Sequence, residues 1–402
     1  MPLPEAPLLP GAGLPRPWGT RRRRAVAVGI VAGALASGAL LALVVVLAIT
    51  RNWPTNGPAG NPEFGINFSC NQAEYLLLED PALGAAGYVS DDRPGRAAWC
   101  ADVLYRLLTD LGARHVRLSV EWSQVEPRDG VYDFALTDAL LQASEESGAS
   151  VLLSVGIKGQ RHPEYYIPGW LLDRLDLADH SDISANPLLR ERALEMIHAI
   201  VGHAATSPAI EAWLADNEPY HGSPRAHTWY LGREFVRKEV AAIRAADPRA
   251  RPVVINHAEK LTMDRRWRWA LEDADIVGTS IYPFRNYELF GQPFVIDILG
   301  LGPFTPNYAA RAREAVAAGK QFWITELQAE PWADPDIRFV NPDRPARDLT
   351  AKNFRQNLDY ARRSGANRVY LWGAEWWLLQ RERYDDSTWW EIARAAITGA
   401  LP

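Results

Sequence analysis

One local pattern recurs along the chain and constrains its fold more than any other feature. An amphipathic helical stretch ends at a glycine, a few small or polar residues follow, and an apolar run comes next, around Gly112, Gly148, Gly319 and Gly365. Glycine just past a helix end readily adopts a left-handed cap, and a continuous apolar run after it is typical of a buried strand. The repeated unit therefore predicts a parallel sheet.

Further apolar runs raise the number of expected strands to eight, separated by helical stretches with one apolar face. The expected strands cover 64–69, 115–120, 151–155, 210–215, 252–256, 275–282, 322–325 and 368–372. Eight such units without a break for a second domain predict a single (β/α)8 TIM barrel over residues 63–402. An open doubly wound sheet is the alternative, although no glycine-rich phosphate-binding fingerprint follows the first strand.

The first 62 residues differ in composition from the rest. Residues 1–24, rich in proline and ending in an arginine run, predict a disordered basic cytoplasmic tail. Residues 25–50 hold no charged side chain, and as a helix they would measure roughly 39 Å against the ~30 Å core of a bilayer. We expect a single transmembrane helix over 25–50, a linker over 51–62 and an extracytoplasmic barrel. A cleaved signal peptide is the alternative.

Charge and cysteine content narrow the class of protein. Residues 1–24 carry +4 of a chain whose net charge is −6, which leaves −10 for the remainder. An acidic body argues against nucleic acid as a partner. The only cysteines, Cys70 and Cys100, follow the expected membrane segment and form a disulfide candidate, the alternative being two unpaired buried thiols. No histidine pair has metal-ligand spacing, so neither a metal nor another cofactor is expected.

Two glutamates stand where a TIM barrel places its working residues, at the carboxyl ends of strands. Glu218, after Asn217, ends the expected fourth strand, and Glu326 ends the seventh. Two carboxyl groups that converge on one bond can cleave a glycoside. At a separation of ~5–5.5 Å one is the proton donor and the other the nucleophile, whereas ~6.5–9.5 Å leaves room for the water of an inverting enzyme. Their proximity separates their pKa values, because the ionised group raises the pKa of its neighbour. Glu330 is the alternative nucleophile.

At these strand ends the chain resembles the retaining glycoside hydrolases of clan A, both the cellulase-like family 5 and the β-galactosidase-like members. The resemblance covers nearly all of residues 64–395 and is carried by VRLSVEWSQVEPRDGVYDF, DNEP, SIYP, ITELQ and LWGAEWW. It implies that Glu218 is the acid/base and Glu326 the nucleophile. The stretch from Trp122 to Phe134 is similar in both groups and does not choose between them.

The same resemblance implies roles for four other residues. Asn217 would contact the sugar 2-hydroxyl, and Arg117 would hold the nucleophile region. Tyr282 would hydrogen-bond the nucleophile, and Trp372 would stack under the sugar. Arg117 could instead form an ordinary ion pair, and Tyr282 could be a packed aromatic residue.

Several other polar and aromatic residues follow the expected strands. The histidines after the third, fourth and fifth strands could touch sugar hydroxyls or serve as surface or supporting residues, namely His162, His221 and His257. Flat indole rings stack on sugar faces, although most tryptophans belong to cores. Besides Trp372, the candidates for substrate contact are Trp332 and Trp376.

The leading hypothesis is a membrane-anchored retaining β-glycosidase that acts on an oligo- or polysaccharide outside the cytoplasm. The same two glutamates would serve a transglycosylase, in which a sugar hydroxyl replaces water. A different class of protein, a non-catalytic carbohydrate-binding barrel of the cell envelope, would be expected to lack one of the two carboxyl groups. A metal-dependent barrel hydrolase would need clustered His and Asp at strand ends, which the sequence does not show.

Overall fold

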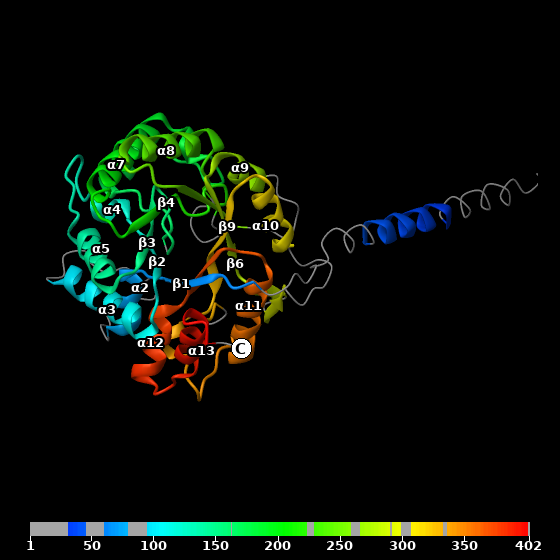
Figure 1. Ribbon diagram of the computed structural model, residues 1–402. Helices are drawn as coiled ribbons and strands as arrows, with labels where there is room; N and C mark the ends of the chain where they lie inside the picture. The colour runs from blue at the N-terminus through cyan, green and yellow to red at the C-terminus, as the bar shows by residue number, and fades with distance from the viewer. Residues whose placement is uncertain are drawn as a thin grey trace, which may run out of the picture. The chain divides into compact units, whose positions relative to one another are not determined.

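The computed structural model of this chain describes residues 31–45, 60–78, 95–161, 163–222, 229–258, 266–289, 292–298, 307–332 and 336–400. The chain divides into two compact units, Met1–Trp53 and Pro54–Pro402. The described part of the first unit is a helix, and the second unit contains the sheet and the remaining described helices (Figure 1).

The structure corrects the prediction of a transmembrane helix over 25–50. The described part of that segment is helical over residues 31–45, a length of about 22 Å, which is shorter than the ~30 Å hydrocarbon core of a bilayer. Within the described ranges, no helix combines the length and the apolar character needed to cross a membrane. The prediction is therefore wrong. The tail expected over 1–24 and most of the expected linker lie outside the described residues.

Eight parallel strands close into a barrel in the order β1-β10-β9-β6-β5-β4-β3-β2 (Figure 1). The strands are β1 Glu63–Asn67, β2 His115–Ser119, β3 Ser150–Val155, β4 Ile210–Ala215, β5 Val253–Ala258, β6 Ile276–Ile281, β9 Gln321–Gln328 and β10 Arg368–Trp372. Each overlaps a strand expected from the sequence, so the predicted TIM barrel is confirmed and the open sheet is excluded.

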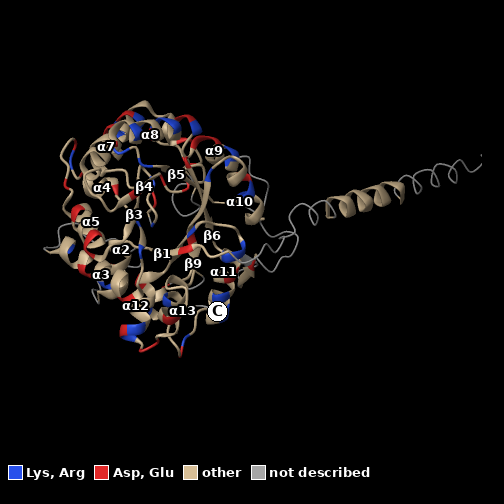
Figure 2. Ribbon diagram, viewed as in Figure 1, with Lys and Arg blue, Asp and Glu red and all other residues tan. Residues whose placement is uncertain are grey.

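Helices form a ring around the strands, and charged residues of both signs are spread along this ring (Figure 2). Gly112 and Gly148 end two of these helices with φ of 70° and 71°, the left-handed caps that the repeated pattern predicts. The described α-helices of this unit are α2 Cys70–Leu77, α3 Arg96–Leu111, α4 Trp122–Val125, α5 Ala135–Ser147, α6 Gly169–Leu172, α7 Pro187–Ala204, α8 Arg233–Ala246, α9 Arg266–Asp273, α10 Tyr308–Ala317, α11 Ala351–Arg363, α12 Ala374–Arg383 and α13 Thr388–Ile397.

Side chains alternate across the barrel wall, as expected of strands. The interior is filled by a small apolar cluster that includes Leu152, Leu214 and Val254. Residues of the opposite parity, such as Leu118 on β2, belong to the larger core that includes the surrounding helices. Arg117 therefore points into the barrel, at the same level as the strand ends that carry the predicted site.

A two-stranded antiparallel hairpin, β7 Phe284–Leu289 and β8 Gln292–Asp297, lies between β6 and β9 in the sequence. This hairpin was not expected from the sequence. It lies outside the closed barrel, which accounts for part of the length beyond the ~250 residues typical of this fold.

The structure places Cys70 and Cys100 in a disulfide with a Cα–Cα distance of 5.5 Å. The bond joins the first residue of α2 to α3, so it ties together the two helices that lie between β1 and β2 in the sequence. Glu74 lies close to both sulfur atoms. Because the sulfurs are bonded to each other and Glu74 pairs with Arg96 at 2.9 Å, this cluster is structural.

Candidate active site

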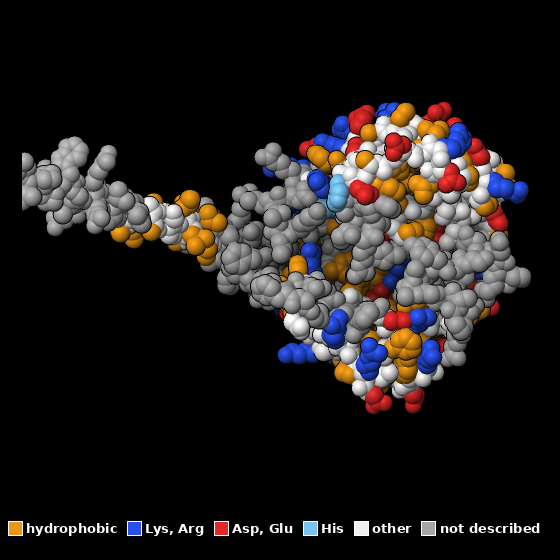
Figure 3. Space-filling model, turned by 180° about the vertical axis from the view of Figure 1, so that it is seen from behind, with side chains coloured by type: hydrophobic (Ala, Val, Ile, Leu, Met, Phe, Trp, Pro, Cys, Tyr) orange, Lys and Arg blue, Asp and Glu red, His pale blue; other side chains and the backbone are white. Residues whose placement is uncertain are grey.

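The two predicted carboxyl groups come from the ends of β4 and β9. Glu326 lies on β9, near its carboxyl end. Glu218 follows β4 by three residues, and its backbone has a positive φ of 48°. That left-handed conformation is uncommon for a residue with a side chain and is found disproportionately at functional sites. One face of the barrel unit is hollowed near its middle, with acidic and basic side chains in the hollow (Figure 3).

Glu326 is buried and receives one strong hydrogen bond on each carboxylate oxygen. Arg117 Nη1 donates to Oε1 at 2.6 Å, and the Tyr282 hydroxyl donates to Oε2 at 2.6 Å. Arg117 is itself 0% exposed, so its charge acts in a low-dielectric environment. Burial, followed by the charge of Glu326, raises the pKa of Tyr282 well above its usual value, and the phenol keeps its proton. The resemblance to clan A implied that Arg117 and Tyr282 would contact Glu326, and both residues do so.

Asn217 and Asn256 connect the two strand ends. Asn217 Oδ1 accepts from Arg117 Nη2 at 2.8 Å and from Asn256 Nδ2 at 2.9 Å. Asn256, at the end of β5, also accepts from the backbone N–H of Glu218 at 2.7 Å. One continuous hydrogen-bonded network therefore runs from Glu326 to the backbone of Glu218. Sequence reasoning missed Asn256, whose place near the end of a strand was the available signal.

Glu218 differs from Glu326 in its surroundings. The pKa of Glu218 is raised to about 7, mainly by burial and next by the charge of Glu326. The nearby Lys158 ammonium opposes the shift without cancelling it. At neutral pH a substantial fraction of Glu218 is therefore protonated, as a general acid requires.

Glu330, the alternative nucleophile, is engaged elsewhere. It accepts from Arg161 Nη1 at 2.5 Å and from Trp372 Nε1 at 2.8 Å. Arg161 also pairs with Glu375 at 3.5 Å, and its guanidinium lies 4.0 Å from the centroid of the Trp372 ring. Trp372 is only 2% exposed, so a charged group rather than open space covers part of this ring. Arg161 and Glu375 were not expected from the sequence.

The other predicted residues vary in how near they lie to the carboxyl pair. The Trp332 ring lies 4.8 Å from the ring of Tyr282, the residue whose hydroxyl binds Glu326, whereas Trp376 is buried. His257 is buried on β5, and its ring lies 4.6 Å from that of His221. His162 falls outside the described residues.

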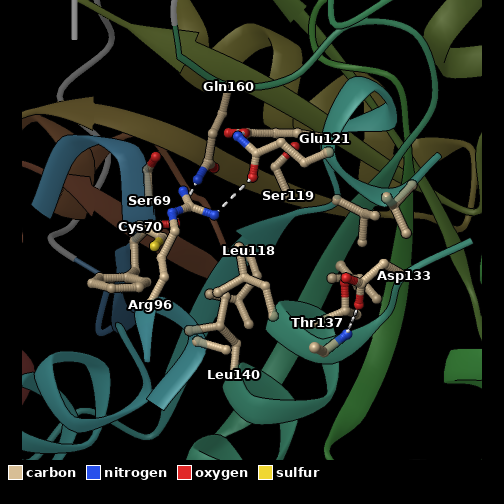
Figure 4. Close-up of a pocket in the computed structure, with 18 of the residues that line it drawn as sticks. Ser69, Cys70, Arg96, Leu118, Ser119, Glu121, Asp133, Thr137, Leu140 and Gln160 are labelled. Atoms are coloured by element: carbon tan, nitrogen blue, oxygen red, sulfur yellow. Dashed lines mark hydrogen bonds between the residues drawn. The ribbon is translucent and has the colours of Figure 1, made fainter. Parts of the chain in front are cut away.

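A cavity of about 320 Å³ lies away from this pair, between the outside of the barrel wall and the ring of helices (Figure 4). Leu118 and Leu140 contribute to its apolar side, and Arg96, Glu121 and Gln160 to its polar side. Arg96 is already bound to Glu74 and Asn71. Neither Glu218 nor Glu326 is among the residues that line this cavity, so it is separate from the carboxyl pair.

Comparisons with known proteins point to one group of enzymes. A family model described as "Beta-galactosidase", glycoside hydrolase family 42, matches residues 93–229, the part of the chain that includes Glu218. The β-galactosidase BbgII of Bifidobacterium bifidum is 27% identical over 147 residues, which are 34% of this chain and 21% of that enzyme. The chain thus resembles clan A glycoside hydrolases.

Solved structures extend this similarity to the whole barrel. A β-galactosidase from Rahnella sp. R3 matches with a TM-score of 0.55 and 15% identity, over 87% of this chain and 58% of that one. A GH5_18 protein from Bifidobacterium longum subsp. infantis matches with a TM-score of 0.50 and 14% identity, over 78% and 69%. At such identities the likeness shows the fold. The chain spans about a fifth of the BbgII enzyme and little more than half of the Rahnella enzyme.

Proposed function

We propose that this chain is a glycoside hydrolase that cleaves β-glycosidic bonds by double displacement, with Glu218 as acid/base and Glu326 as nucleophile. The observation that supports this proposal is that the two carboxyl groups have different surroundings. Glu326 receives a donor on each oxygen, whereas the pKa of Glu218 is raised to about 7. One protonated and one ionised carboxyl group are what displacement at an anomeric carbon needs.

In the first step Glu326 attacks the anomeric carbon and Glu218 gives its proton to the leaving oxygen, so that a covalent glycosyl-enzyme forms. In the second step Glu218, now a carboxylate, takes a proton from water, and the water oxygen displaces Glu326. Two displacements retain the anomeric configuration. A sugar hydroxyl in place of water would complete a transglycosylation with the same residues.

The names of the relatives suggest where to look for a substrate. The family model and the curated relative are both described as β-galactosidases, which supports terminal β-galactosides as the first substrates to test. Activated aryl β-galactosides should be compared with aryl glucosides, mannosides and xylosides. The anomer released first, read by proton NMR, distinguishes retention from inversion.

Substitution of each carboxyl group tests the assignment. Glu326→Gln should lower turnover of every active aryl glycoside by roughly 10⁴-fold or more, and Glu218→Gln should lower it less when the leaving group needs no protonation. Added azide should restore turnover only to Glu218→Gln. Glu191→Gln, at an exposed position on α7, is the matched control.

Trapping the intermediate gives an independent reading. A 2-fluoro-glycoside inhibitor should leave its sugar on Glu326, as found by mass spectrometry of peptides. The proposal is overturned if both variants keep wild-type turnover, or if the sugar is attached to any other residue.

We further propose that the barrel works in an oxidising compartment outside the cytoplasm. The disulfide between Cys70 and Cys100 supports this location, because such bonds persist there and are rare in the cytosol. Alkylation of the protein as isolated from its own cells should leave both cysteines unmodified until a reductant is added. Alkylation without a reductant would contradict the proposal.

A further inference from the structure

Two buried carboxyl groups lie behind the strand end that carries Glu218, and the proposed mechanism does not use them. Asp216 is the residue that follows β4, and Glu239 lies on α8, which packs against that strand. Both residues are 0% exposed. Asp216 Oδ2 and both carboxyl oxygens of Glu239 are buried with no hydrogen-bond donor among the described residues, and the two groups are near enough that each affects the pKa of the other. Two ionised carboxylates buried side by side with few donors would repel strongly, so one of them holds a proton that it can share with the other.

The donors around the pair identify which group is ionised. Asp216 Oδ1 accepts from the backbone N–H of Lys158 at 2.5 Å, and the Lys158 ammonium also favours the charged form of Asp216. Both oxygens of Glu239 are buried and have no conventional donor among the described residues. Glu239 therefore stays protonated, and its carboxylic acid donates a hydrogen bond to the carboxylate of Asp216. Burial, reinforced by Asp216, raises the pKa of Glu239 well above its usual value, in agreement with this assignment.

The carboxylate of Asp216 is closely packed against the backbone at the end of β3. A side chain at Gly156 would collide with it, so the glycine makes room for the group. Asp216 also donates its backbone N–H to Val155 O at 2.9 Å, and Asn217 donates to Lys158 O at 2.9 Å. These bonds join the turn after β4 to the end of β3.

This turn is strained. Asp216 has φ of 55° and Glu218 has φ of 48°, and left-handed backbone is unfavourable at a residue that has a side chain. Such conformations persist only where surrounding contacts determine them. Asp216 contributes one set of these contacts, through the Lys158 backbone and Glu239. The Asn256 side chain contributes another, through the backbone N–H of Glu218.

We propose that Glu239, as a neutral carboxylic acid, is a positioning residue that donates a hydrogen bond to Asp216 and so fixes the turn from which Glu218 acts. Its effect on turnover rests on the proposed function. The shared proton and the fixed turn do not depend on it.

Two substitutions separate donation from packing. Glu239→Gln keeps a neutral donor of the same shape, whereas Glu239→Leu fills similar space without a donor. We expect kcat to stay within about threefold of wild type in Glu239→Gln and to fall roughly 10- to 100-fold in Glu239→Leu, with KM nearly unchanged. Glu234→Gln, at an exposed position on the same helix, is the matched control and should match wild type.

A merely structural role predicts a different result. It would lower stability without separating the Gln variant from the Leu variant in kcat, and it would leave the alkaline limb of the kcat/KM profile in place. We expect Glu239→Leu to displace that limb, because the partly exposed carboxyl group of Glu218 is no longer held in one position. Equal kcat in wild type and Glu239→Leu, or equal impairment of both variants, would overturn the proposal.

A spectroscopic measurement tests the proton without any turnover. At about pH 9, above the pKa of Glu218, the infrared difference between wild type and Glu239→Gln should show the carbonyl band of one protonated carboxylic acid. Glu234→Gln should show no such difference. Amide exchange at Lys158 should be faster in Glu239→Leu than in wild type, because its acceptor is less firmly held.

These readouts distinguish the two proposals. If the band is lost in Glu239→Gln but no glycoside is turned over, the proposed function fails and the acid pair stands. If turnover follows the proposed mechanism but the band is unchanged, Glu239 is ionised and the inference fails. The infrared comparison decides the matter even if Glu239→Leu does not fold.

Discussion

Replacing Glu218 with glutamine should remove a specific pH dependence from the stability of the barrel. Below pH 4.5, the ordinary value for this side chain, the carboxyl group is protonated in both folded and unfolded protein. Above it the unfolded chain loses the proton, while the folded protein keeps it until about pH 7. The unfolded state then binds fewer protons, so the free energy of unfolding falls as pH rises through this window.

The size of the effect follows from the shift of the pKa. A rise from 4.5 to about 7 corresponds to about 3 kcal/mol, since each pKa unit is worth about 1.4 kcal/mol. Wild type should therefore lose about 3 kcal/mol relative to Glu218→Gln between about pH 4 and about pH 8. Glutamine cannot ionise and keeps the shape of the neutral acid, so the variant should be relatively more stable at the alkaline end.

Urea unfolding of the full chain, followed by tryptophan fluorescence at several pH values, measures this difference. Comparison of wild type with Glu218→Gln cancels the other titrating groups to first order. Glu191→Gln, at an exposed site, should run parallel to wild type. A difference between wild type and Glu218→Gln that stays flat within about 1 kcal/mol would show that Glu218 ionises normally in the folded protein, and the reasoning for its acid role would be refuted.

Three other substitutions have expected outcomes. Tyr282→Phe removes one of the two donors to Glu326 and should lower kcat on an aryl glycoside roughly 10²-fold without changing the fold seen by circular dichroism; an unchanged kcat would contradict the role. Cys70→Ser should lower the free energy of unfolding by roughly 3 kcal/mol and make stability insensitive to reductant, as urea unfolding would show. Gly156→Ala should destabilise the barrel more than Gly148→Ala, which costs roughly 1–2 kcal/mol as a left-handed cap with open space around it; equal thermal shifts would contradict the close packing of Asp216.

The strands were predictable because their signals are local. An apolar run of β-formers after a left-handed glycine cap identifies a buried parallel strand from neighbouring residues alone. The hairpin β7–β8 has no such signal, since it lies outside the barrel wall. The membrane prediction was wrong because an uncharged run shows that a segment is apolar, whereas a membrane span also needs a long enough helix, and the described helix covers 31–45.

The candidate site was predictable in part. Glu218 and Glu326 stand at strand ends, and strand ends can be read from the sequence. The contacts that Arg117 and Tyr282 make were implied by the resemblance to clan A. Asn256 and Arg161 were missed, because their partners follow the ends of other strands and only the closed barrel brings them together.

The two glutamates reach different states through the groups that the barrel places around them. Glu326 is flanked by a buried guanidinium and a phenol that donate to it. Glu218 belongs to a strained turn, and the negative charge of Glu326 disfavours the ionised form of the Glu218 carboxyl group. Removal of the Glu326 charge should therefore lower the pKa of Glu218 toward its ordinary value. In Glu326→Gln, the pH range over which ionisation of Glu218 lowers the free energy of unfolding should therefore become narrower. That range should be unchanged if burial alone sets the pKa of Glu218.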